Sequence, residues 1–352
     1  MAPPSESLFP ACTGENKLPF FHNLEKFEED FLLRGPIRCP ETKCYTVKHA
    51  YVSPYGAVFR GGWICPPSVY RDSAENRFLH LASYYKKRWH GRVRRISSPC
   101  LVVHHSWYDN YYHWLIEILP RLSLVRSRMK EFTLLMHANQ SPFHKSSLAL
   151  LGVDHVEEIR DDELVCCDRV SFMNFPIQPV IEKYSHDGRR IRLNRTNVHP
   201  GLMKKIREEV LSAAGVVPAS PGLSVYISRK KAPKRKVENE DEVETFLHAR
   251  GFSSVFLEDL TFTEQVKLLY NTKILVGAHG AGMANIIFMQ PGTQVLDFTH
   301  RDYHEFCFLN IANAVDVRLA QINSPGKSYE NPQQNDVKID MGILGKLIEE
   351  LD

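Results

Sequence analysis

The segment KILVGAHGAGMANIIF, residues 273–288, predicts a buried strand that passes into a helix through a glycine-rich loop. Gly277, Gly280 and Gly282 let the backbone turn tightly and let a ligand approach it closely. The free amides and the positive dipole end of the helix then form a site for phosphate or pyrophosphate, with His279 as a further donor. The spacing is neither the G-x-G-x-x-G of dinucleotide-binding folds nor a P-loop, which ends in G-K-[ST]. The alternative is a tight turn whose glycines serve only helix packing.

Beyond His199, helical and strand patterns alternate with short links. Helices are predicted over 201–214, 239–250 and 261–270, and strands over 223–229, 253–258, 273–276 and 293–299. Thr261 and Glu264 form a capping-box pattern at the start of the third helix. Such alternation predicts an α/β fold with a parallel sheet covered by helices, which binds ligands at the carboxyl ends of its strands. The glycine loop lies at one of these ends.

The chain of 352 residues exceeds the usual size of one domain, so two domains are expected. We place the first at 1–198, with 1–35 as a loosely attached arm, and the second at 199–335. A C-terminal helix within 336–352 is expected to pack back across the first domain. CLVVHH (100–105) and FTLLMH (132–137) predict two buried strands, and the residues between them predict a long helix that begins near Asn110 and bends at Pro120.

The composition is that of an ordinary soluble protein, with 43% hydrophobic and 24% charged residues. A formal charge of +3 is too small to indicate a nucleic-acid partner. No apolar run approaches the roughly 18 residues needed to span a bilayer, and the N-terminus lacks a signal-peptide pattern. The 8 cysteines include no C-x-x-C pair, which favours reduced thiols in the cytoplasm, although a luminal protein without its anchor would have the same composition. The basic run KKRWHGRVRR (86–95) is either a solvated face or a contact with anionic lipid or a charged acceptor, so membrane contact is at most peripheral.

On the predicted long helix, His113, Glu117 and Arg121 are spaced by four residues and project from one side. A carboxylate beside an imidazole in an apolar segment suits general base catalysis, because burial and pairing shift both groups toward the working pH. Either group can take the proton, and we favour Glu117, which His113 and Arg121 would keep ionised. The alternative is a buried ion pair that only steadies the helix. A metal set of His104, Asp109 and His113 would cross the predicted helix start, so no metal site is expected.

A second charged cluster follows the strand predicted at 223–229. Six cations lie within eight positions of the strand end: Arg229, Lys230, Lys231, Lys234, Arg235 and Lys236. Guanidinium groups match phosphate oxygens in a bidentate way, so this loop can hold a pyrophosphate leaving group without a metal. The alternative is a solvated basic loop. Its position on the same sheet edge as the glycine loop favours a ligand.

The order of three segments resembles glycosyltransferase family 61. These segments are NYYHWLIEILPRL (110–122), VYISRKKAPKRKVENEDEV (225–243) and LTFTEQVKLLYNTKILVGAHGAGMANIIFMQPGTQVLDF (260–298). The family includes bacterial polysaccharide enzymes, plant xylan-decorating enzymes, and animal enzymes that add N-acetylglucosamine to protein or to O-mannose. The resemblance implies a GT-B fold, in which two Rossmann-like domains face a cleft. It also implies inverting, metal-independent transfer, with the nucleotide-sugar, commonly a uridine diphosphate sugar, bound by the second domain and the acceptor by the first.

Matched to the family's motifs, the donor-facing residues would be Ser228, Arg229, Arg235, His279, Gly280, Gly282 and Asn285. Glu117 and His113 would be the catalytic residues near the acceptor, and Asn110 and Arg121 would belong to the substrate site. Two features depart from the family. The stem and membrane anchor of its Golgi members do not precede the matching part, and the KKAPKRK loop is unusually basic, which leaves open which cation contacts phosphate.

These observations predict a glycosyltransferase, for example a xylosyltransferase or an N-acetylglucosaminyltransferase, that needs no cofactor beyond its nucleotide-sugar co-substrate. The acceptor would be a glycan, a lipid-linked saccharide or a protein. One alternative is a nucleotide-sugar epimerase of the same architecture, which would act on donor alone. The other is a catalytically inactive nucleotide-sugar-binding protein, which would tolerate the loss of both His113 and Glu117.

Overall fold

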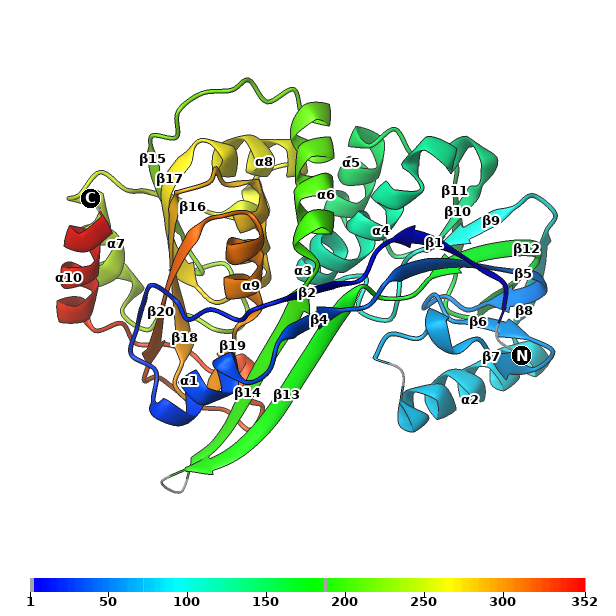
Figure 1. Ribbon diagram of the computed structural model, residues 1–352, viewed down its shortest axis with the longest axis horizontal. Helices are drawn as coiled ribbons and strands as arrows, with labels where there is room; N and C mark the ends of the chain where they lie inside the picture. The colour runs from blue at the N-terminus through cyan, green and yellow to red at the C-terminus, as the bar shows by residue number, and fades with distance from the viewer. Residues whose placement is uncertain (1–2, 72, 187–188, 352) are drawn as a thin grey trace. The chain divides into compact units, whose positions relative to one another are not determined.

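The computed structural model describes residues 3–71, 73–186 and 189–351, which fall into two compact units (Figure 1). The first unit comprises Met1–Cys12 with Pro40–Pro176, and the second comprises Thr13–Cys39 with Ile177–Asp352. The boundary predicted near residue 198 lies too late in the chain. The reason is strand pairing: β13 (Ile177–His186) pairs with β14 (Arg189–Val198), which pairs with β19 (Tyr303–Glu305) of the second unit.

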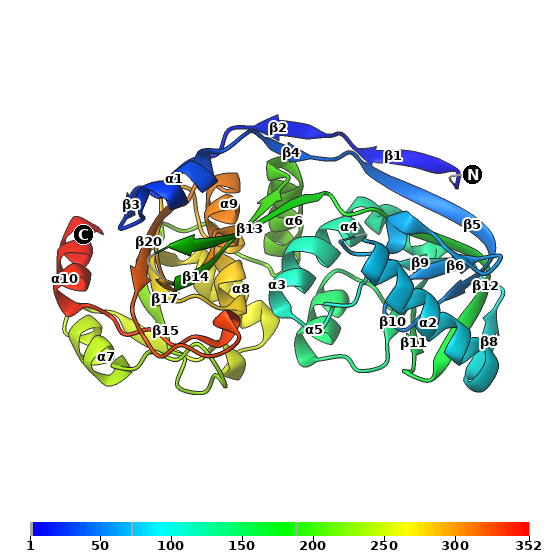
Figure 2. The same cartoon turned by 90° about the horizontal axis from the view of Figure 1, so that it is seen from below.

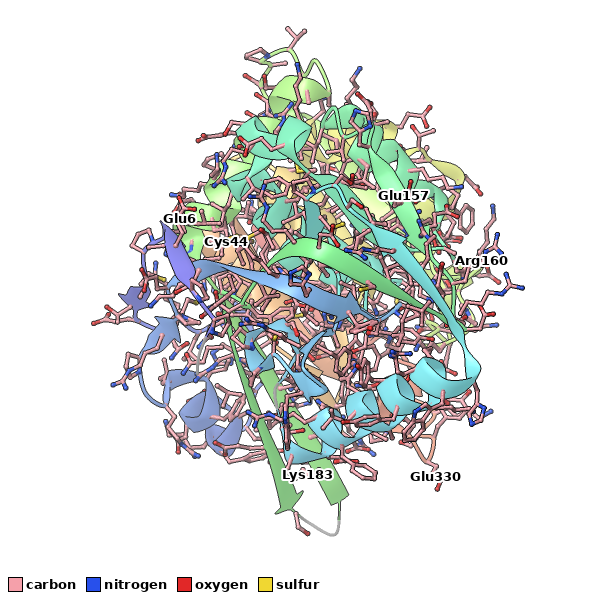
Figure 3. The ribbon with its side chains drawn as sticks, turned by 90° about the vertical axis from the view of Figure 1, so that its right-hand side faces the viewer. Glu6, Cys44, Glu157, Arg160, Lys183 and Glu330 are labelled. Carbon is pink, nitrogen blue, oxygen red and sulfur yellow. The ribbon has the colours of Figure 1, made fainter. Side chains whose placement is uncertain are left out.

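The first unit is built on a mixed sheet. Its strands run in the order β11 (Val156–Ile159), β10 (Thr133–His137), β9 (Cys100–Val102), β12 (Glu163–Met173), β5 (Thr42–Val52), β6 (Val58–Arg60) and β7 (Trp63–Ile64). β8 (Arg92–Ile96) pairs with β12, and β1 (Ser5–Phe9) pairs with β5, where Glu6 lies opposite Cys44 (Figure 3). The strands from β11 to β12 are parallel, and those from β12 to β7 are antiparallel. The two predicted strands are confirmed as β9 and β10, although β9 ends at Val102.

The helices of the first unit are α2 (Ala74–His90), α3 (Tyr111–His113), α4 (Leu119–Leu124) and α5 (Pro142–Leu150), with 3₁₀ helices η1 (Pro66–Ser68) and η3 (Arg126–Glu131) (Figure 2). The predicted long helix is interrupted, because a π-helical turn, η2 (Trp114–Ile118), separates α3 from α4. Pro120 lies in the first turn of α4, where its missing N–H is tolerated. π-Helical turns are rare and frequently occur at functional sites.

The second unit contains the predicted parallel α/β sheet. Six strands run parallel in the order β16 (Ser253–Val255), β15 (Leu223–Ile227), β17 (Thr272–Ala278), β18 (Gln294–His300), β20 (Arg318–Ser324) and β3 (Phe21–His22). β19 joins β18 to the β13–β14 hairpin. A separate two-stranded sheet is formed by β2 (Cys12–Gly14) and β4 (Ile37–Cys39). Alternating strands and helices from residue 200 onward therefore fold as the sequence predicts.

The helices of the second unit are α1 (Lys26–Leu33), α6 (Pro200–Ala213), α7 (Glu240–His248), α8 (Phe262–Tyr270), α9 (Cys307–Ala314) and α10 (Met341–Leu351), with 3₁₀ helices η4 (Leu257–Asp259), η5 (Ala281–Phe288) and η6 (Pro332–Gln334). The capping box at Thr261 is confirmed, since its hydroxyl accepts from the Glu264 amide at 3.3 Å. The helix predicted after the glycine loop is the 3₁₀ helix η5. In the part of the chain that the structure describes, no helix has both the length and the apolar character needed to cross a bilayer.

Two predictions about the ends of the chain are wrong. The C-terminal helix α10, predicted to pack on the first domain, belongs to the second unit: Leu344 and Leu347 lie in its core with Val243. Nor are residues 13–35 a loose arm. The buried guanidinium of Arg195 on β14 donates to the carbonyls at the end of α1, including that of Phe31 at 3.1 Å, so α1 is held in the second unit.

Candidate active site

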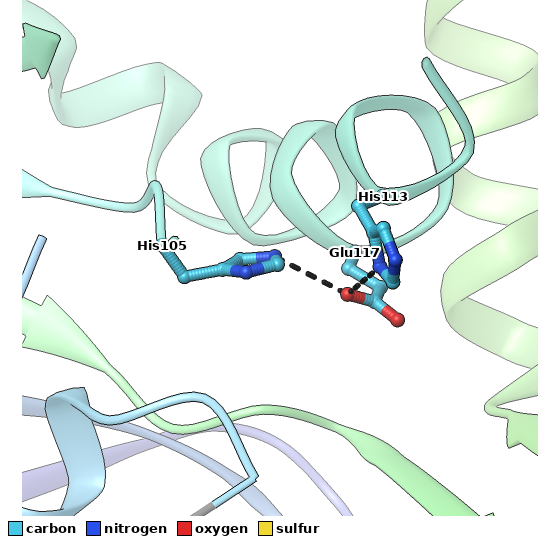
Figure 4. A group of neighbouring side chains, drawn as sticks. All are labelled: His105, His113 and Glu117. Carbon is cyan, nitrogen blue, oxygen red and sulfur yellow. Dashed lines mark hydrogen bonds and ion pairs between the residues drawn. The ribbon is translucent and has the colours of Figure 1, made fainter. Parts of the chain in front are cut away.

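A carboxylate and two imidazoles converge in the first unit (Figure 4). Glu117 lies on the π-helical turn and His113 one turn before it, and the His113 Nδ1 atom is 2.8 Å from Glu117 Oε2. His105 follows β9 and places its Nε2 atom 3.2 Å from the same oxygen. The hydroxyl of Tyr70 donates to the other oxygen, Oε1, at 3.2 Å. Both oxygens of the carboxylate are therefore occupied by neighbouring side chains.

Burial and the contacts within this cluster together set its protonation states. Burial alone would raise the pKa of Glu117, but the charge of His113 and the hydrogen bonds from both imidazoles outweigh it and hold the pKa well below its ordinary value. Burial lowers the pKa of His105 to about 4 and raises that of Tyr70. At neutral pH Glu117 is thus an anion enclosed by donors. The side chain of His113 is 16% exposed, against 1% for Glu117, so His113 is the member that solvent or a substrate reaches.

Arg121 and Asn110, both predicted in the substrate site, have structural roles. Arg121 is fully buried, and its guanidinium donates to the carbonyls of Glu117, Met173 and Val103 and lies 4.1 Å from the Phe175 ring. It braces the π-helical turn rather than contacting the Glu117 carboxylate. The Asn110 side chain accepts from the backbone amide two residues on at 3.0 Å and so caps α3.

The histidine that completes the cluster is not the one singled out in the sequence. His104 is buried against the carbonyl of Pro54 at 2.8 Å, and Asp109 is exposed. His105 instead joins His113 and Glu117, and the three potential ligand atoms lie within 4.8 Å of one another. Two nitrogens and one oxygen at this spacing are a donor set that fits a divalent transition metal. The sequence signal for His105 was its place directly beyond a parallel strand, where site residues collect.

In the second unit, two glycines of the loop after β17 each leave room for a different neighbouring side chain. A Cβ on Gly280 would lie 2.0 Å from the Arg229 guanidinium, so this glycine lets Arg229 rest against the loop backbone. A Cβ on Gly282 would lie 2.7 Å from a methyl of Leu257. The absence of a side chain at Gly280 therefore makes room for the Arg229 guanidinium, whereas its absence at Gly282 makes room for the packing of Leu257. Gly280 has an extended backbone with φ of −166°, so close approach rather than a left-handed turn is what requires glycine here.

The other predicted donor residues are mostly engaged inside the unit. Asn285 is fully buried and donates to Gln265 at 2.9 Å, and the Ser228 hydroxyl donates to Glu240 at 2.8 Å. His279 is buried, with its Nδ1 atom 2.9 Å from Asp297 Oδ2. Asp297 escaped the sequence reasoning, although it lies on β18 directly beside Gly277 of β17. It fixes the orientation of His279, which lines a surface hollow at the ends of β17 and β18.

The cations of the basic loop divide into two groups. Lys230 pairs with Asp241 at 2.6 Å, and Lys231 pairs with Asp259 at 2.6 Å. Arg229 instead donates to the carbonyls of Arg235 and Lys234, at 2.8 and 2.7 Å. Within the described residues, neither Arg229 nor Arg235 forms an ion pair with a carboxylate. Lys230 and Lys231 are thus paired with carboxylates, whereas Arg229 and Arg235, like Lys234 and Lys236, form no such ion pair within the described residues.

The charge of Arg235 acts on the neighbouring Arg229. Burial, and next the charge of Arg235, lower the pKa of Arg229 to about 10. Arg235 adopts a left-handed backbone with φ of 56°, which is uncommon for a residue other than glycine and clusters at ligand sites. It also lines the hollow that contains His279 and Tyr303. This edge of the sheet therefore presents the Arg235 guanidinium and the His279 imidazole to one opening, an arrangement that favours an anion.

Comparison with known proteins identifies the family of this chain. The profile of the family Glycosyltransferase 61 matches residues 111–296, slightly more than half of the chain, and the chain belongs to this family. The match confirms the resemblance drawn from the sequence. It spans both the His113–Glu117 pair and the arginine and glycine loops.

Curated relatives share only part of their length with this chain. They include EGF domain-specific O-linked N-acetylglucosamine transferases of Mus musculus (25% identical over 137 residues), Gallus gallus (26% over 141 residues) and Drosophila melanogaster (34% over 124 residues). These matches cover 34% to 38% of this chain and about a quarter of each relative, 24% to 26%. Among solved structures, a flavo di-iron protein mutant from Thermotoga maritima aligns over 90% of this chain and 92% of its own, but a TM-score of 0.26 and 11% identity support no inference.

Proposed function

We propose that this protein is an inverting glycosyltransferase that moves a sugar from a nucleoside diphosphate, in the first instance uridine diphosphate, to an acceptor hydroxyl. The observation that carries the proposal is the pair of uncompensated arginines beside the glycine loop, within a chain that also holds an oriented histidine in the family-matched region. We further propose the GT-B arrangement for the two α/β units, with donor bound by the second and acceptor by the first.

The donor's diphosphate would bind at Arg229, Arg235 and His279. An anion placed between the two guanidinium groups removes their mutual repulsion and accepts bidentate hydrogen bonds. As the bond from the anomeric carbon to the diphosphate breaks, negative charge grows on the leaving oxygen, and these preorganised cations stabilise it. Such a site supplies the charge that a metal ion otherwise supplies, so we propose that transfer needs no metal.

The acceptor's proton would pass to His113. Its Nδ1–H donates to Glu117, so the lone pair of the neutral ring lies on Nε2, and His113 is the more exposed of the two side chains. Glu117 itself is a poor base because its pKa is held low and both oxygens are occupied. This reverses the preference drawn from the sequence: His113 would be the base, and Glu117 would orient it and stabilise its protonated form, with His105 and Tyr70 holding Glu117 in place.

The names of the relatives guide the choice of substrates. They are O-linked N-acetylglucosamine transferases specific for EGF domains, so uridine diphosphate N-acetylglucosamine and protein hydroxyls are the first donor and acceptor to test, followed by uridine diphosphate xylose and glycan or lipid-linked acceptors. Action in the cytoplasm, with at most peripheral membrane contact, remains part of the proposal.

The experiment is an acceptor-dependent assay. The full chain, pretreated with EDTA, is incubated with each donor and a panel of peptide and glycan acceptors, and products are identified by mass spectrometry. We expect nucleotide release that requires an acceptor and continues in EDTA. Isomerised donor without any acceptor would identify an epimerase, and donor binding without turnover would identify an inactive binder. Activity that EDTA abolishes and a divalent cation restores would instead assign the His105, His113 and Glu117 cluster to a metal.

A further inference from the structure

Helix α2 of the first unit exposes a stripe of aromatic side chains. Phe78, Tyr85 and Trp89 are spaced by seven and four residues, which places them on one line along a helix of 3.6 residues per turn. Phe78 is 70% exposed and Trp89 is 75% exposed, and Leu79 beside them is 58% exposed. Large apolar side chains are normally buried, and a contiguous exposed group of them marks an interaction site.

The fold holds α2 mainly through another face, although Tyr85 of the stripe also contacts Gly62. α2 packs on the first unit through Tyr84 and Leu81, which join a cluster around Phe59, and the Tyr84 ring stacks on Phe59 at 4.5 Å between ring centres. The side chain of Ser73 caps the first turn by accepting from the Asn76 amide at 3.1 Å. Because α2 is anchored through another face, the aromatic stripe is available to a partner.

Strand β7 extends the aromatic surface, since it lies beside α2 (Figure 1). The Tyr85 hydroxyl donates to the carbonyl of Gly62 at 3.1 Å, and the Tyr85 and Trp89 rings lie 5.7 Å apart. Trp63 follows Gly62 directly and is 77% exposed. We call the exposed set the α2 surface: Trp63, Phe78, Leu79, Tyr85 and Trp89.

Cations border the α2 surface. At 3.6 residues per turn, Lys86 and Arg88 fall about 80° to either side of the aromatic line, and both are exposed. Neither forms an ion pair with another described residue. Within 74–90 the sequence contains one carboxylate, Glu75, against four Lys and Arg residues. The surface is therefore both apolar and positively charged.

We propose that the α2 surface docks on the headgroup region of a membrane that contains anionic lipids. Trp and Tyr rings, with an apolar body and a polar edge, favour the membrane–water interface, and a helix with an apolar stripe and flanking cations lies flat in that interface. Lys86 and Arg88 then face anionic headgroups, so the charge of the surface selects such lipids over neutral ones. This docking is independent of the transfer reaction, and it turns the peripheral membrane contact left open by the basic run into a defined surface.

The test measures binding of the full chain to vesicles of phosphatidylcholine alone or mixed with phosphatidylserine, by co-sedimentation. We expect binding only where phosphatidylserine is present, and its loss when ionic strength is raised to about 0.5 M, because salt screens exposed charges. Lys86→Glu with Arg88→Glu should weaken binding at least roughly 25-fold, since each cation near an anionic leaflet contributes about fivefold. Phe78→Ser with Trp89→Ser should remove it.

Matched variants and tryptophan fluorescence complete the test. Lys130→Glu with Val217→Ser changes an exposed cation and a 77% exposed apolar residue elsewhere, and should bind as the wild type does. Vesicles should shift tryptophan emission to the blue in Trp107→Phe but not in Trp63→Phe with Trp89→Phe. Equal binding to phosphatidylcholine alone, binding unchanged in the α2 variants, or no vesicle binding by folded wild type overturns the proposal. A further outcome also overturns it: a wild type that does not bind vesicles but forms a dimer, which Phe78→Ser with Trp89→Ser dissociates. The α2 surface would then bind a second copy of the chain.

Discussion

The two candidate sites of this member of glycosyltransferase family 61 handle charge in opposite ways. In the first unit Glu117 is enclosed, with His105 and His113 on one oxygen and Tyr70 on the other. In the second unit Arg229 and Arg235 lie side by side and, within the described residues, without a carboxylate partner. An enclosed charge fixes the position of its neighbours. Two like charges without counterions repel each other, and this repulsion persists until a ligand supplies the opposite charge.

This contrast suggests that loss of a side chain should have different consequences in the two units. Variants in the enclosed cluster should change the rate of the chemical step and leave donor affinity alone. Variants in the open cluster should change donor affinity first.

Replacing His113 should have the largest effect on turnover. His113→Asn removes the proposed base, and a positioned base contributes about 10² to 10⁴-fold in rate. We expect turnover to fall by at least roughly a hundredfold, while the dissociation constant for uridine diphosphate, measured by calorimetry, stays unchanged. Glu117→Gln keeps the shape of the orienting group and should show a smaller loss. If Glu117→Gln is the inactive variant and His113→Asn the mild one, the roles of the two residues are reversed.

Removing Arg229 should weaken donor binding rather than slow the chemical step. A charged hydrogen-bond partner contributes about 1.5 to 3 kcal/mol, so Arg229→Ala should raise the dissociation constant for uridine diphosphate by one to two orders of magnitude. Lys231→Ala is the matched control, because its ammonium is already paired with Asp259. Equal losses in both variants would mean that the loop acts through its overall charge and not through the unpaired guanidinium.

The two glycines of the loop should separate binding from packing. Gly280→Ala would displace the Arg229 guanidinium and should weaken donor binding as Arg229→Ala does. Gly282→Ala would press on Leu257, and we expect it to cost about 1 to 3 kcal/mol of stability with donor affinity retained. Melting temperature and calorimetric titration distinguish the two. If Gly282→Ala has the wild-type melting temperature but no longer binds the donor, then Gly282 faces the donor, as predicted from the sequence.

The smallest effect concerns pH. Burial lowers the pKa of His105 to about 4 and that of His144 to about 4, both in the first unit. Between these values and the ordinary value of about 6.5, the unfolded chain binds protons that the folded chain does not, so stability falls as pH falls through this window. The stability that Glu117 adds is present above the ordinary carboxyl pKa and is lost below it.

Tryptophan fluorescence reports this acid effect, because Trp63, Trp89, Trp107 and Trp114 all belong to the first unit. We expect the first unit's melting temperature to fall steadily from pH 7 to pH 5, with a shallower slope in His144→Gln. His144 accepts from the Ser141 amide and contacts the Tyr108 carbonyl, so a second ring proton would break the first bond. A slope that His144→Gln leaves unchanged would show that other groups take up the protons.

Local patterns in the sequence predicted the second unit well. Periodicity located its strands and helices from α6 to β18, and the Thr261 capping box marked the start of α8. What escaped prediction depends on contacts between distant segments. Arg195 holds α1 in the second unit across more than 160 positions, and α10 packs beside α7 about 100 positions away. Neither contact leaves a local trace in the sequence.

The candidate sites divide in the same way. The pair His113 and Glu117 was visible because four residues make one helical turn, and the arginine loop was visible as a charge run. His105 and Asp297 were missed because strand positions bring them to their partners. The burial of Glu117, which favours His113 as the base, could not be predicted from the sequence either. It arises because Tyr70 and His105 pack around a π-helical turn.

The most direct measurement is the anomeric configuration of the transferred sugar, determined by nuclear magnetic resonance on a product made in EDTA by wild type and by His113→Asn. The account predicts a wild-type product with the configuration opposite to that of the donor sugar, and almost none from His113→Asn at saturating donor. A product that retains the donor's configuration, or one that forms only when a divalent cation is added, would contradict a metal-free inverting transfer with His113 as its base.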